Sequence, residues 1–379
     1  MTKVYLIRHG EAEGNLYRRG QGHFDGRITP IGERQIDCLA RRFRDIPVQA
    51  VYSSDLSRAI TTARGVLRYH PELQLQIDPR LREICMGIWE DQPWGNAEYD
   101  APEQMYNFNA APENWVIEGA ERFDHLCARI RGAVLDIASR HDGETIAIVS
   151  HGMAIRTLLW DVLRREGSPN APGHGDNTSV SLLEVTGETI HAVFLNDISH
   201  LPAELSTFAR QSWWKNEGGS ELNNLRIVPL KLPEEQALYL DCYADAWRFA
   251  HGSLTGFEPP LYLRSAAEHA AQTPLALMKA LRGEALAGII ELDTERCVRE
   301  NAGWISLLYM VPELRGHGLA VQLLGHAVSV YRNLGRKAIR LHVSKENPRA
   351  IRFYEKYGFR TLHKEKGVVA PLLLMEKSI

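Results

Sequence analysis

The sequence predicts two domains, an α/β domain built on a largely parallel sheet and an α+β domain that follows it. In the first half, short apolar runs alternate with stretches of helical periodicity, which is typical of a sheet with helices on both faces. In the second half, three consecutive strand patterns precede a strand–helix–strand order. The length of 379 residues also favours two domains, because about 150 residues is typical of one.

The elements of the first half follow from apolar periodicity and its interruptions. Gly187 and Glu188 separate the last two strands and predict a hairpin at the edge of the sheet. We expect strands at residues 4–7, 49–52, 145–149, 179–185 and 189–195, and helices at 31–43, 56–69 and 153–163.

The pattern changes between residues 196 and 224, where polarity is mixed and a Gly-Gly-Ser run occurs at 218–220. We therefore place the boundary near residue 220, which predicts domains 1–220 and 221–379. In the second domain we expect strands at residues 225–230, 275–281, 285–292, 304–311, 338–343 and 369–375, and helices at 233–249, 319–334 and 348–357.

The composition is that of an ordinary globular protein, with 44% hydrophobic and 24% charged residues. A net charge of −3 does not indicate nucleic acid or an anionic membrane as a partner. The five scattered cysteines contain no CxxC pair, so we expect a reduced protein without a metal. No run of about 18 apolar residues is present, and a cytoplasmic location is expected.

Two His-Gly pairs follow predicted strands, at His9 and at His151, and arginines accompany them. Arg8 precedes the first pair, and Arg58 lies in the first turn of the helix that follows residues 53–55. The carboxyl ends of parallel strands meet at one edge of a sheet, where ligands bind. Two imidazoles, two guanidiniums and a helix N-terminus there suit a doubly negative tetrahedral group such as phosphate. One such pair alone would be more typical of an ordinary surface turn, whereas two pairs with the intervening arginine motif favour a site.

Further short motifs accompany these residues. They are Arg8–Glu11 with Asn15, then Asp25, Thr29, Gly32 and Gln35, Ser53–Ala59, Leu81–Glu83, Gly87–Glu90, Val149–Gly152 and Asn196–Leu201. Together, over roughly residues 1–201, they resemble the histidine phosphatase superfamily, the phosphoglycerate-mutase-like group. The resemblance implies a doubly wound sheet with helices on both faces.

The resemblance also implies a role for each matched residue. His9 would be the nucleophile that forms a phosphohistidine, and a neutral imidazole is needed for that attack. Arg8, Arg58 and His151 would hold the phosphoryl oxygens, with Asn15 as a further oxygen ligand. Glu83 would protonate the leaving alcohol and then activate water. No metal is required.

The residues after Glu83 resemble the phosphatase branch more than the mutases, which favours hydrolysis of a small phosphorylated metabolite. The segment departs from the family in two places: Asp91 replaces the usual glycine, and residues 118–121 lack the commoner Gly-Glu-Ser. Two questions stay open. The aromatic residues between Trp89 and Trp115 could line a substrate pocket or pack a lid. The cluster of Arg18, Arg19, His23 and Arg27 could steer anions or form a solvated face.

A glycine-containing turn follows a strand in the second half and precedes a long helix. Such a turn lets main-chain N–H groups approach a diphosphate closely. Downstream, Asn347 and Pro348 predict a helix start, and Gly358 predicts its end. The turn and its flanks comprise Met310, Val311, Arg315, Gly316, His317, Gly318, Leu319 and Ala320.

Over roughly residues 225–379 these features resemble the GNAT acetyltransferase superfamily, whose acetyl-CoA loop matches Arg315, Gly318 and Ala320. The resemblance implies that the main chain of 315–320 binds the pyrophosphate of acetyl-CoA and that Met310 and Val311 pair with its pantetheine arm. Tyr354 would protonate the departing thiolate, and Asn347 would help to orient the cofactor. The acceptor would be a small amine, with Glu291 as one candidate base.

Three hypotheses follow. The chain is a bifunctional phosphatase and N-acetyltransferase, a phosphatase with a non-catalytic acetyl-CoA-sensing domain, or a protein whose first half is a mutase. The sequence determines neither substrate nor the oligomeric state.

Overall fold

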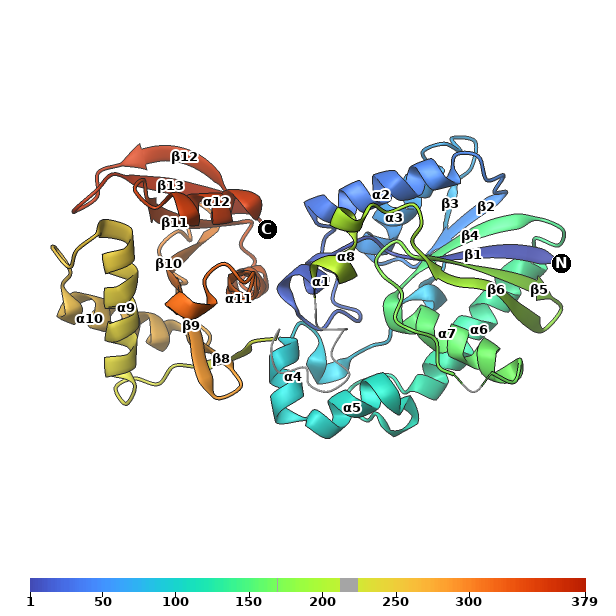
Figure 1. Ribbon diagram of the computed structural model, residues 1–379, viewed down its shortest axis with the longest axis horizontal. Coiled ribbons are helices and arrows are strands. Elements are labelled where there is room, and N and C mark those ends of the chain that lie inside the picture. Colours follow the sequence, from blue (N-terminus) through green and yellow to red (C-terminus); the bar gives the residue numbers. More distant parts are fainter. Residues whose placement is uncertain (169, 212–223) are drawn as a thin grey trace. The chain divides into compact units, whose positions relative to one another are not determined.

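The computed structural model describes residues 1–168, 170–211 and 224–379 (Figure 1). These residues form two compact units, one ending at residue 211 and one beginning at residue 224, and Pro93–Asn96 groups with the second unit. The predicted boundary near residue 220 falls outside the described residues.

The first unit contains a six-stranded sheet in the order β3-β2-β4-β1-β5-β6. The strands β1 to β4 are mutually parallel, whereas β5 runs antiparallel to β1 and forms the predicted edge hairpin with β6. The strands are β1 Thr2–Arg8, β2 Ala50–Ser53, β3 Leu75–Ile77, β4 Thr145–Ser150, β5 Val180–Thr186 and β6 Thr189–Asp197.

Helices α2 and α3 cover one face of this sheet, and α6 and α7 cover the other, which confirms the doubly wound prediction (Figure 1). Thr29 begins α2, because its hydroxyl accepts a hydrogen bond from the Gly32 N–H (3.0 Å) and Pro30 occupies the first turn. The helices are α1 Glu13–Tyr17, α2 Pro30–Phe43, α3 Ser57–Leu67, α4 Trp94–Asp100, α5 Pro102–Ala110, α6 Phe123–Ser139, α7 Gly152–Arg165 and α8 Thr207–Arg210.

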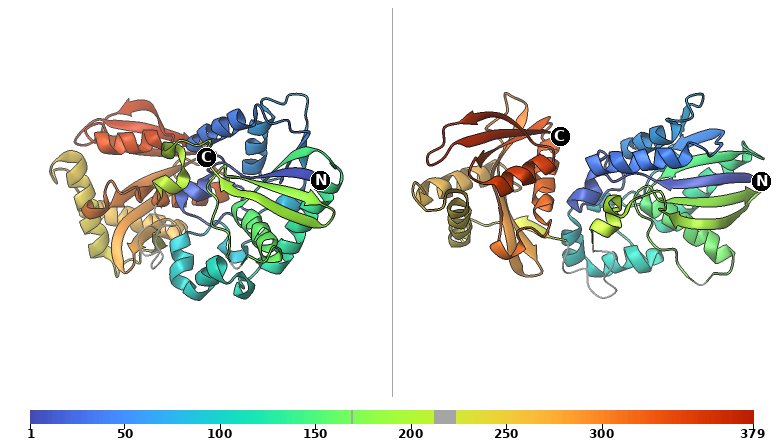
Figure 2. Two further views of the ribbon diagram at one scale, coloured as in Figure 1. Left: turned by 45° about the vertical axis from the view of Figure 1, so that its right-hand side comes forward. Right: turned by 45° about the horizontal axis from the view of Figure 1, so that its top comes forward.

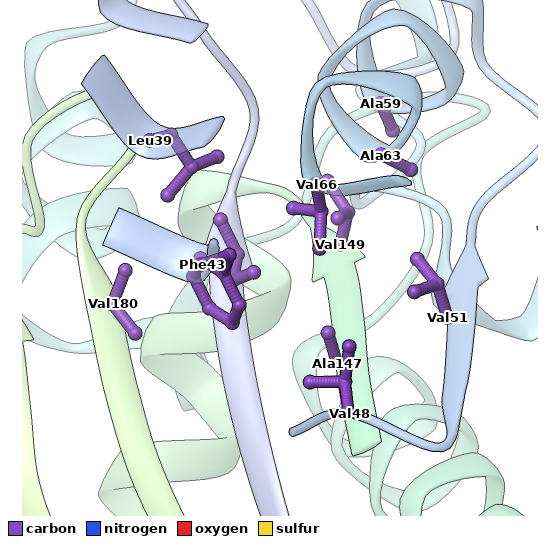
Figure 3. Close-up of a cluster of buried hydrophobic side chains, with 11 residues drawn as sticks. Leu39, Phe43, Val48, Val51, Ala59, Ala63, Val66, Ala147, Val149 and Val180 are labelled. Carbon is purple, nitrogen blue, oxygen red and sulfur yellow. The ribbon is translucent and has the colours of Figure 1, made fainter. Parts of the chain in front are cut away.

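A cluster of buried apolar side chains fixes α2 and α3 to the sheet (Figure 3). Leu39 and Phe43 of α2 meet Ala63 and Val66 of α3 above the central strands, where Val149 of β4 is fully buried. The carboxyl ends of β1, β2 and β4 are therefore held at one edge by a close-packed core.

The second unit contains a seven-stranded sheet in the order β12-β13-β11-β10-β9-β8-β7. Neighbouring strands are antiparallel except for β10 and β11, which are parallel. The strands are β7 Arg226–Pro229, β8 Leu277–Arg282, β9 Ala285–Asp293, β10 Ala302–Met310, β11 Ala338–Ser344, β12 Arg360–Glu365 and β13 Leu372–Ser378.

The strands β10 and β11 form a fork. Their pairing covers Ala302–Ile305 of β10, and it ends at the pair Ile305 and Leu341. At the same level, the register of β10 on β9 shifts between Ile305 and Leu307. The remainder of β10, up to Met310, therefore has one edge that β11 does not cover.

Helices pack on both sides of this sheet, with α9 and α10 against β8 to β10 and α11 against β9 to β11 (Figure 2). A buried cluster that includes Leu230, Tyr239, Ala266 and Ile289 joins α9 and α10 to the strands. The helices are α9 Gln236–His251, α10 Pro259–Gln272, α11 Ala320–Asn333 and α12 Pro348–Lys356.

The structure differs from the sequence-based expectation in the last strand, and it contains elements that were not predicted, among them β3, α1, α4, α5 and α8. The last strand begins at Leu372 rather than at 369, because Pro371 has no N–H to donate to the ladder. Helices α6 and α10 were not predicted. Neither was β12, whose side chains are almost all exposed, so that it lacks the apolar alternation of a buried strand.

No helix among the described residues is both long and apolar enough to cross a membrane.

We predict that Phe43→Ala lowers the unfolding free energy of the first unit by about 3–5 kcal/mol, because it removes a fully buried ring from the α2–sheet core. Native-state hydrogen exchange of the β1 and β4 amides measures this change in the full chain. Tyr106→Ala, at a ring that is 65% exposed, is the control and should change stability by less than about 0.5 kcal/mol. Equal effects of the two substitutions would contradict this account of the core.

Candidate active sites

The two predicted histidines lie side by side at the ends of adjacent parallel strands. Arg8 at the end of β1 is in register with Ser150 at the end of β4, so His9 and His151 follow at the same level. Their ring centroids are 5.2 Å apart, and both side chains are buried. The structure therefore brings together the two imidazoles that the sequence separates by more than a hundred residues.

The hydrogen bonds of His9 define its tautomer. Its Nδ1 lies 2.7 Å from the Gly10 carbonyl oxygen, which only accepts, so Nδ1 carries the proton. The other ring nitrogen, Nε2, is then left with a free lone pair whenever the ring is neutral. Burial lowers the pKa of His9 well below 6.5, and the nearby Arg58 and Arg8 guanidiniums lower it further. His9 is therefore a neutral imidazole with a nucleophilic Nε2 at pH 7.

His151 is also neutral, because burial lowers its pKa well below 6.5, helped by the Arg58 charge. Its Nε2 lies 2.7 Å from Ser54 Oγ, which in turn accepts from the Leu56 N–H (3.4 Å). When the Ser54 hydroxyl donates to Nε2, the proton of the ring resides on Nδ1. Within the described residues, His151 Nδ1 is buried without a hydrogen-bond partner.

Both arginines are held by main-chain carbonyls and keep one N–H free. Arg8 Nη1 donates to Gly175 O (2.5 Å), and Arg58 donates to Phe24 O (2.9 Å) and Gly22 O (2.7 Å). Burial lowers the pKa of both guanidiniums, to about 10 for Arg58, which therefore stays charged at pH 7. The Nε atoms of Arg8 and Arg58 are buried without partners in the described part of the chain.

Three unpaired donors thus belong to the residues that surround His9. Buried N–H groups are rarely left unpaired, since each costs about 1–3 kcal/mol. A tetrahedral oxyanion bound at His9 Nε2 would supply acceptors for the guanidinium and imidazole N–H groups. The arrangement fits a phosphoryl group.

Glu83 lies beside this cluster at the start of α7. Its carboxylate accepts hydrogen bonds from the N–H groups of Met153 (2.9 Å) and Ala154 (2.8 Å), two and three residues after His151. A further bond comes from the Ile84 N–H (3.0 Å). Five side chains predicted for one site, those of Arg8, His9, Arg58, Glu83 and His151, are therefore grouped at one sheet edge.

The sequence analysis missed the loop before β5. Besides Gly175, which holds Arg8, it contains Asn177, whose Nδ2 donates to the His9 carbonyl oxygen (3.0 Å) and to Asn15 Oδ1 (3.3 Å). The Oδ1 atom of Asn15 also accepts from the Ala12 N–H (3.0 Å). Asn15 thus supports the catalytic loop, and its predicted contact with phosphate stays a prediction. No short motif in the sequence distinguishes this loop.

The aromatic residues of the lid segment pack on one another. The Trp115 ring is buried, and its centroid lies 5.8 Å from Trp89 and 5.3 Å from Phe108. Tyr99 and Tyr106, in contrast, are exposed. Of the two alternatives for these aromatic residues, packing of a lid rather than lining of a substrate pocket therefore describes Trp89, Phe108 and Trp115.

The basic cluster after the first loop is only partly solvent-exposed: Arg27 is exposed, whereas Arg19 is buried. Arg19 is 7% exposed and pairs with Asp91 (2.7 Å), and His23 Nε2 lies 3.0 Å from the Glu83 carbonyl oxygen. Asp91 has a φ of +54°, a left-handed conformation that explains why glycine is usual at this position. Compared with glycine at this position, the aspartate side chain adds an ion pair with Arg19.

The second predicted site lies at the fork of the second unit. Gly316 and Gly318 have φ values of +91° and +78°, so the loop depends on glycine there. A pocket of about 380 Å³ is lined by this loop, the start of α11 at Ala320, and α12. A cradle of main chain at the start of a long helix fits a pyrophosphate.

The side chain of Arg315 does not face outward as a free cation. Its Nε donates to the Met310 carbonyl oxygen (2.8 Å), and its Nη2 pairs with Asp245. Arg315 therefore fixes the shape of the loop. Arg349, at the start of α12, is a further cation beside this loop, and the sequence did not predict it. Its Nη2 lies 2.8 Å from the position that a Cβ atom on Gly316 would occupy.

The main chain of β10 is partly engaged near the loop. Met310 O accepts from Arg315, and the Val311 N–H donates to Ala287 O (3.0 Å). The Met310 carbonyl and the Val311 N–H are therefore already hydrogen-bonded within the chain, which leaves fewer main-chain groups for a pantetheine arm than expected. The pairing of the arm with these two residues stays a prediction. His317 and Leu319 lie in the same loop, between β10 and α11.

A larger pocket of about 620 Å³ continues from the loop into the fork and is lined by both strands. Tyr354 and Asn347 line both this pocket and the smaller one. Burial raises the pKa of Tyr354, so its hydroxyl keeps its proton at pH 7. Asn347 Oδ1 accepts from the Ala350 N–H (3.1 Å) and begins α12 as predicted.

Glu291 lies on the floor of the larger pocket. One carboxylate oxygen accepts from the Tyr239 hydroxyl (2.9 Å), and the other is 2.6 Å from His269 Nδ1. The neighbouring Asp293 and Glu291 raise the pKa of His269 against the effect of its burial. Glu291 is thus part of a hydrogen-bonded acidic cluster rather than an isolated base.

In the described ranges, no group of three or more His, Cys, Asp or Glu side chains has an arrangement that could hold a metal ion.

Comparisons with known proteins identify a different family in each half of the chain. Residues 4–198 match the histidine phosphatase superfamily (branch 1), and residues 237–359 match the acetyltransferase (GNAT) family. The probable phosphoglycerate mutase GpmB of Enterobacter sp. (strain 638) is 30% identical over 210 residues, which cover 54% of this chain and 96% of that protein. The solved structure of Bacillus stearothermophilus YhfR is 34% identical, with a TM-score of 0.49, and covers 53% of this chain and 99% of its own.

A second relative, the probable phosphoglycerate mutase GpmB of Yersinia pestis (strain Pestoides F), is 34% identical over 163 residues, 43% of this chain and 75% of that protein. The chain belongs to the histidine phosphatase superfamily, and a GNAT acetyltransferase domain follows its phosphatase domain.

We predict that the imidazoles of His9 and His151 remain neutral at about pH 6, where an unperturbed histidine with a pKa of about 6.5 is mostly charged. Nitrogen-15 NMR of the histidine rings measures this directly. Because the unfolded state binds protons that the folded state does not, each buried histidine makes stability fall as the pH drops below about 6.5, by about 1.4 kcal/mol per pH unit. Ring protonation near pH 6.5 in the folded chain would contradict the prediction.

Proposed function

We propose that the chain is a bifunctional enzyme that hydrolyses a small phosphomonoester through a phosphohistidine at His9 and transfers acetyl from acetyl-CoA to a small amine. The observation that carries the first activity is the neutral His9 imidazole beside buried guanidinium and imidazole donors that have no partners among the described residues. A neutral nucleophile surrounded by cations suits attack on a phosphate dianion.

In the proposed first step, Nε2 of His9 attacks phosphorus, and the bond to the leaving alkoxide breaks. Arg8, Arg58 and His151 hold the equatorial oxygens, where charge is spread in the transition state. Glu83 faces the site from the start of α7, takes up a proton as the negative charge of the bound phosphate favours its protonated form, and gives that proton to the departing oxygen. Glu83 then takes a proton from water as the water attacks the phosphohistidine, and His9 is released.

The phosphomonoesterase proposal has a mutase as its competitor, because curated relatives carry the name probable phosphoglycerate mutase. A mutase returns the phosphoryl group to a bound product instead of to water. The residues after Glu83 favour hydrolysis by their likeness to the phosphatase branch. Glu90 holds that segment in place, since its carboxylate accepts from the N–H groups of Met86 (2.9 Å), His23 (2.7 Å) and Phe24 (2.8 Å).

For the second activity, the glycine loop and the fork between β10 and β11 fit acetyl-CoA, which supplies an activated acetyl thioester when bound. Tyr354 lies where the two pockets meet and keeps its hydroxyl proton for the departing sulfur. This intact acid favours catalysis over the alternative of a domain that only senses acetyl-CoA.

We predict that His9→Ala reduces phosphomonoester hydrolysis by about 10³-fold or more, because the substitution removes the nitrogen to which the phosphoryl group would be transferred. Assays on p-nitrophenyl phosphate and on a panel of phosphorylated metabolites measure the loss. His70→Gln, at a buried imidazole whose Nε2 lies 2.8 Å from the Phe43 carbonyl oxygen in α2, is the matched control. Unchanged hydrolysis in His9→Ala would refute the first proposal, and phosphoryl transfer to glycerate in preference to water would establish the mutase.

We predict that Tyr354→Phe lowers kcat of acetyl transfer by about 10²-fold and leaves the dissociation constant of acetyl-CoA within about twofold, because only the proton donor is lost. Steady-state assays on an amine panel give kcat, and calorimetry gives the binding constant. Tight binding of acetyl-CoA by the wild type without turnover of any amine would favour the sensing domain instead.

A further inference from the structure

A histidine–glutamate pair lies at the apex of the fork in the second unit. His342 follows Leu341, whose partner Ile305 forms the last pair between β10 and β11. His342 is thus the first residue of β11 beyond the point where the two strands separate. Its side chain lines the larger pocket together with Tyr354 and Asn347.

The ring of His342 is held in place from two sides. Its Nε2 lies 3.2 Å from Oε2 of Glu365 on β12, and its plane is perpendicular to the Trp304 ring, with centroids 4.7 Å apart. When Nε2 carries the proton toward this carboxylate, Nδ1 keeps a lone pair. A carboxylate that fixes the tautomer and the orientation of an imidazole is the usual support of a histidine base.

The charged and titratable groups around His342 leave it neutral. Burial lowers its pKa, the Glu365 carboxylate opposes this, and Arg296 and His363 lower the pKa further. Arg296 reaches the pocket by stacking on Trp304, with its guanidinium carbon 3.7 Å from the ring centroid. Its lowered pKa makes His342 available as a proton acceptor at pH 7.

The other candidate, Glu291, is less suited to accept a proton. Both of its oxygens already receive hydrogen bonds, from Tyr239 and from His269, and it is 1% exposed. With Asp293, which lies 3.3 Å from His269 Nε2, it forms an acidic floor to the pocket. The stacked rings of Tyr243 and Tyr262 (centroids 4.3 Å apart) offer a cationic amine an aromatic wall.

We propose that His342 is the general base for the acceptor amine and that Glu365 is the residue that positions it; this rests on the proposed acetyltransferase activity. The amine enters as an ammonium, and His342 Nδ1 takes one proton, which frees the nitrogen lone pair. The nitrogen then bonds to the thioester carbonyl carbon, and the carbon–sulfur bond breaks with its electron pair on sulfur. Tyr354 protonates the sulfur, the second nitrogen proton restores the phenol, and the His342 proton leaves to solvent.

The test uses the full chain and a primary amine that the wild type acetylates, with kcat/KM measured between about pH 5 and pH 9. We expect His342→Gln to lower kcat/KM by about 10²- to 10³-fold and to remove the acidic limb of the profile, with unchanged acetyl-CoA binding by calorimetry. We expect Glu365→Gln to lower kcat/KM by about 10- to 100-fold and to move the limb to lower pH, because the charge that raises the pKa of His342 is gone. NMR titration of the His342 ring in the ligand-free chain should show the same downward shift.

His191→Gln is the matched control, since this exposed imidazole likewise contacts a glutamate, Glu166 (2.7 Å), but belongs to the first unit and is not among the pocket residues. It should stay within about twofold of the wild type. Wild-type activity and pH profile in His342→Gln would overturn the assignment, as would an acidic limb that survives in His342→Gln and disappears in Glu291→Gln. A wild type that acetylates no amine would instead overturn the proposed acetyltransferase, and the assignment with it.

Discussion

The first unit depends on one electrostatic constraint, the burial of two guanidiniums and two imidazoles at a common sheet edge. Burial lowers the pKa of the arginines. Burial and the positive charge of the arginines together lower the pKa of both imidazoles, which are therefore neutral. A buried charge needs partners, and main-chain carbonyls of Gly22, Phe24 and Gly175 supply only some of them. The remaining N–H groups define the shape and the charge of the ligand that the site requires.

Much of the surrounding structure serves to hold this cluster. The loop at residues 21–24 accepts hydrogen bonds from Arg58 through its carbonyls and donates to Glu90 through its N–H groups. Gly10 N–H donates to Thr62 Oγ1 (2.9 Å), which ties the chain after His9 to α3. Glu11, fully buried one residue later, accepts from Thr29 Oγ1 (2.8 Å) and pairs with Arg210. Preorganisation of this kind reduces the reorganisation that the reaction itself needs.

The candidate site of the second unit is built differently, because it lies at a gap between two strands of a sheet. The strands β10 and β11 separate after Ile305, and the uncovered edge of β10 leads to a loop that relies on two glycines in left-handed conformations. The pocket that follows has an aromatic wall at Tyr262, an acidic floor at Glu291 and a histidine at its apex. The fork thus opens into the two pockets in which we propose that the acyl donor and the amine bind.

Apolar runs in the sequence predicted the largely buried strands β1, β2 and β4, and the motifs at their ends predicted that the residues after these strands would meet. It could not predict contacts that depend on loops without a motif, such as Asn177 behind His9. Arg315 matched a family pattern, but its side chain fixes the loop from within, a role that only the position of Asp245 reveals. His342 and Glu365 lie on β11 and β12, which are separated in the sheet by β13. No short-range pattern in the sequence predicts that these two residues meet.

The most direct test of the account is a crystal structure of the chain with orthovanadate, which mimics a phosphoryl group in flight. The account predicts vanadium bonded to Nε2 of His9, with its oxygens on the free N–H groups of Arg8, Arg58 and His151 and with Glu83 facing the apical oxygen. Vanadate bound elsewhere, or His9 and His151 pointing into separate regions, would contradict it.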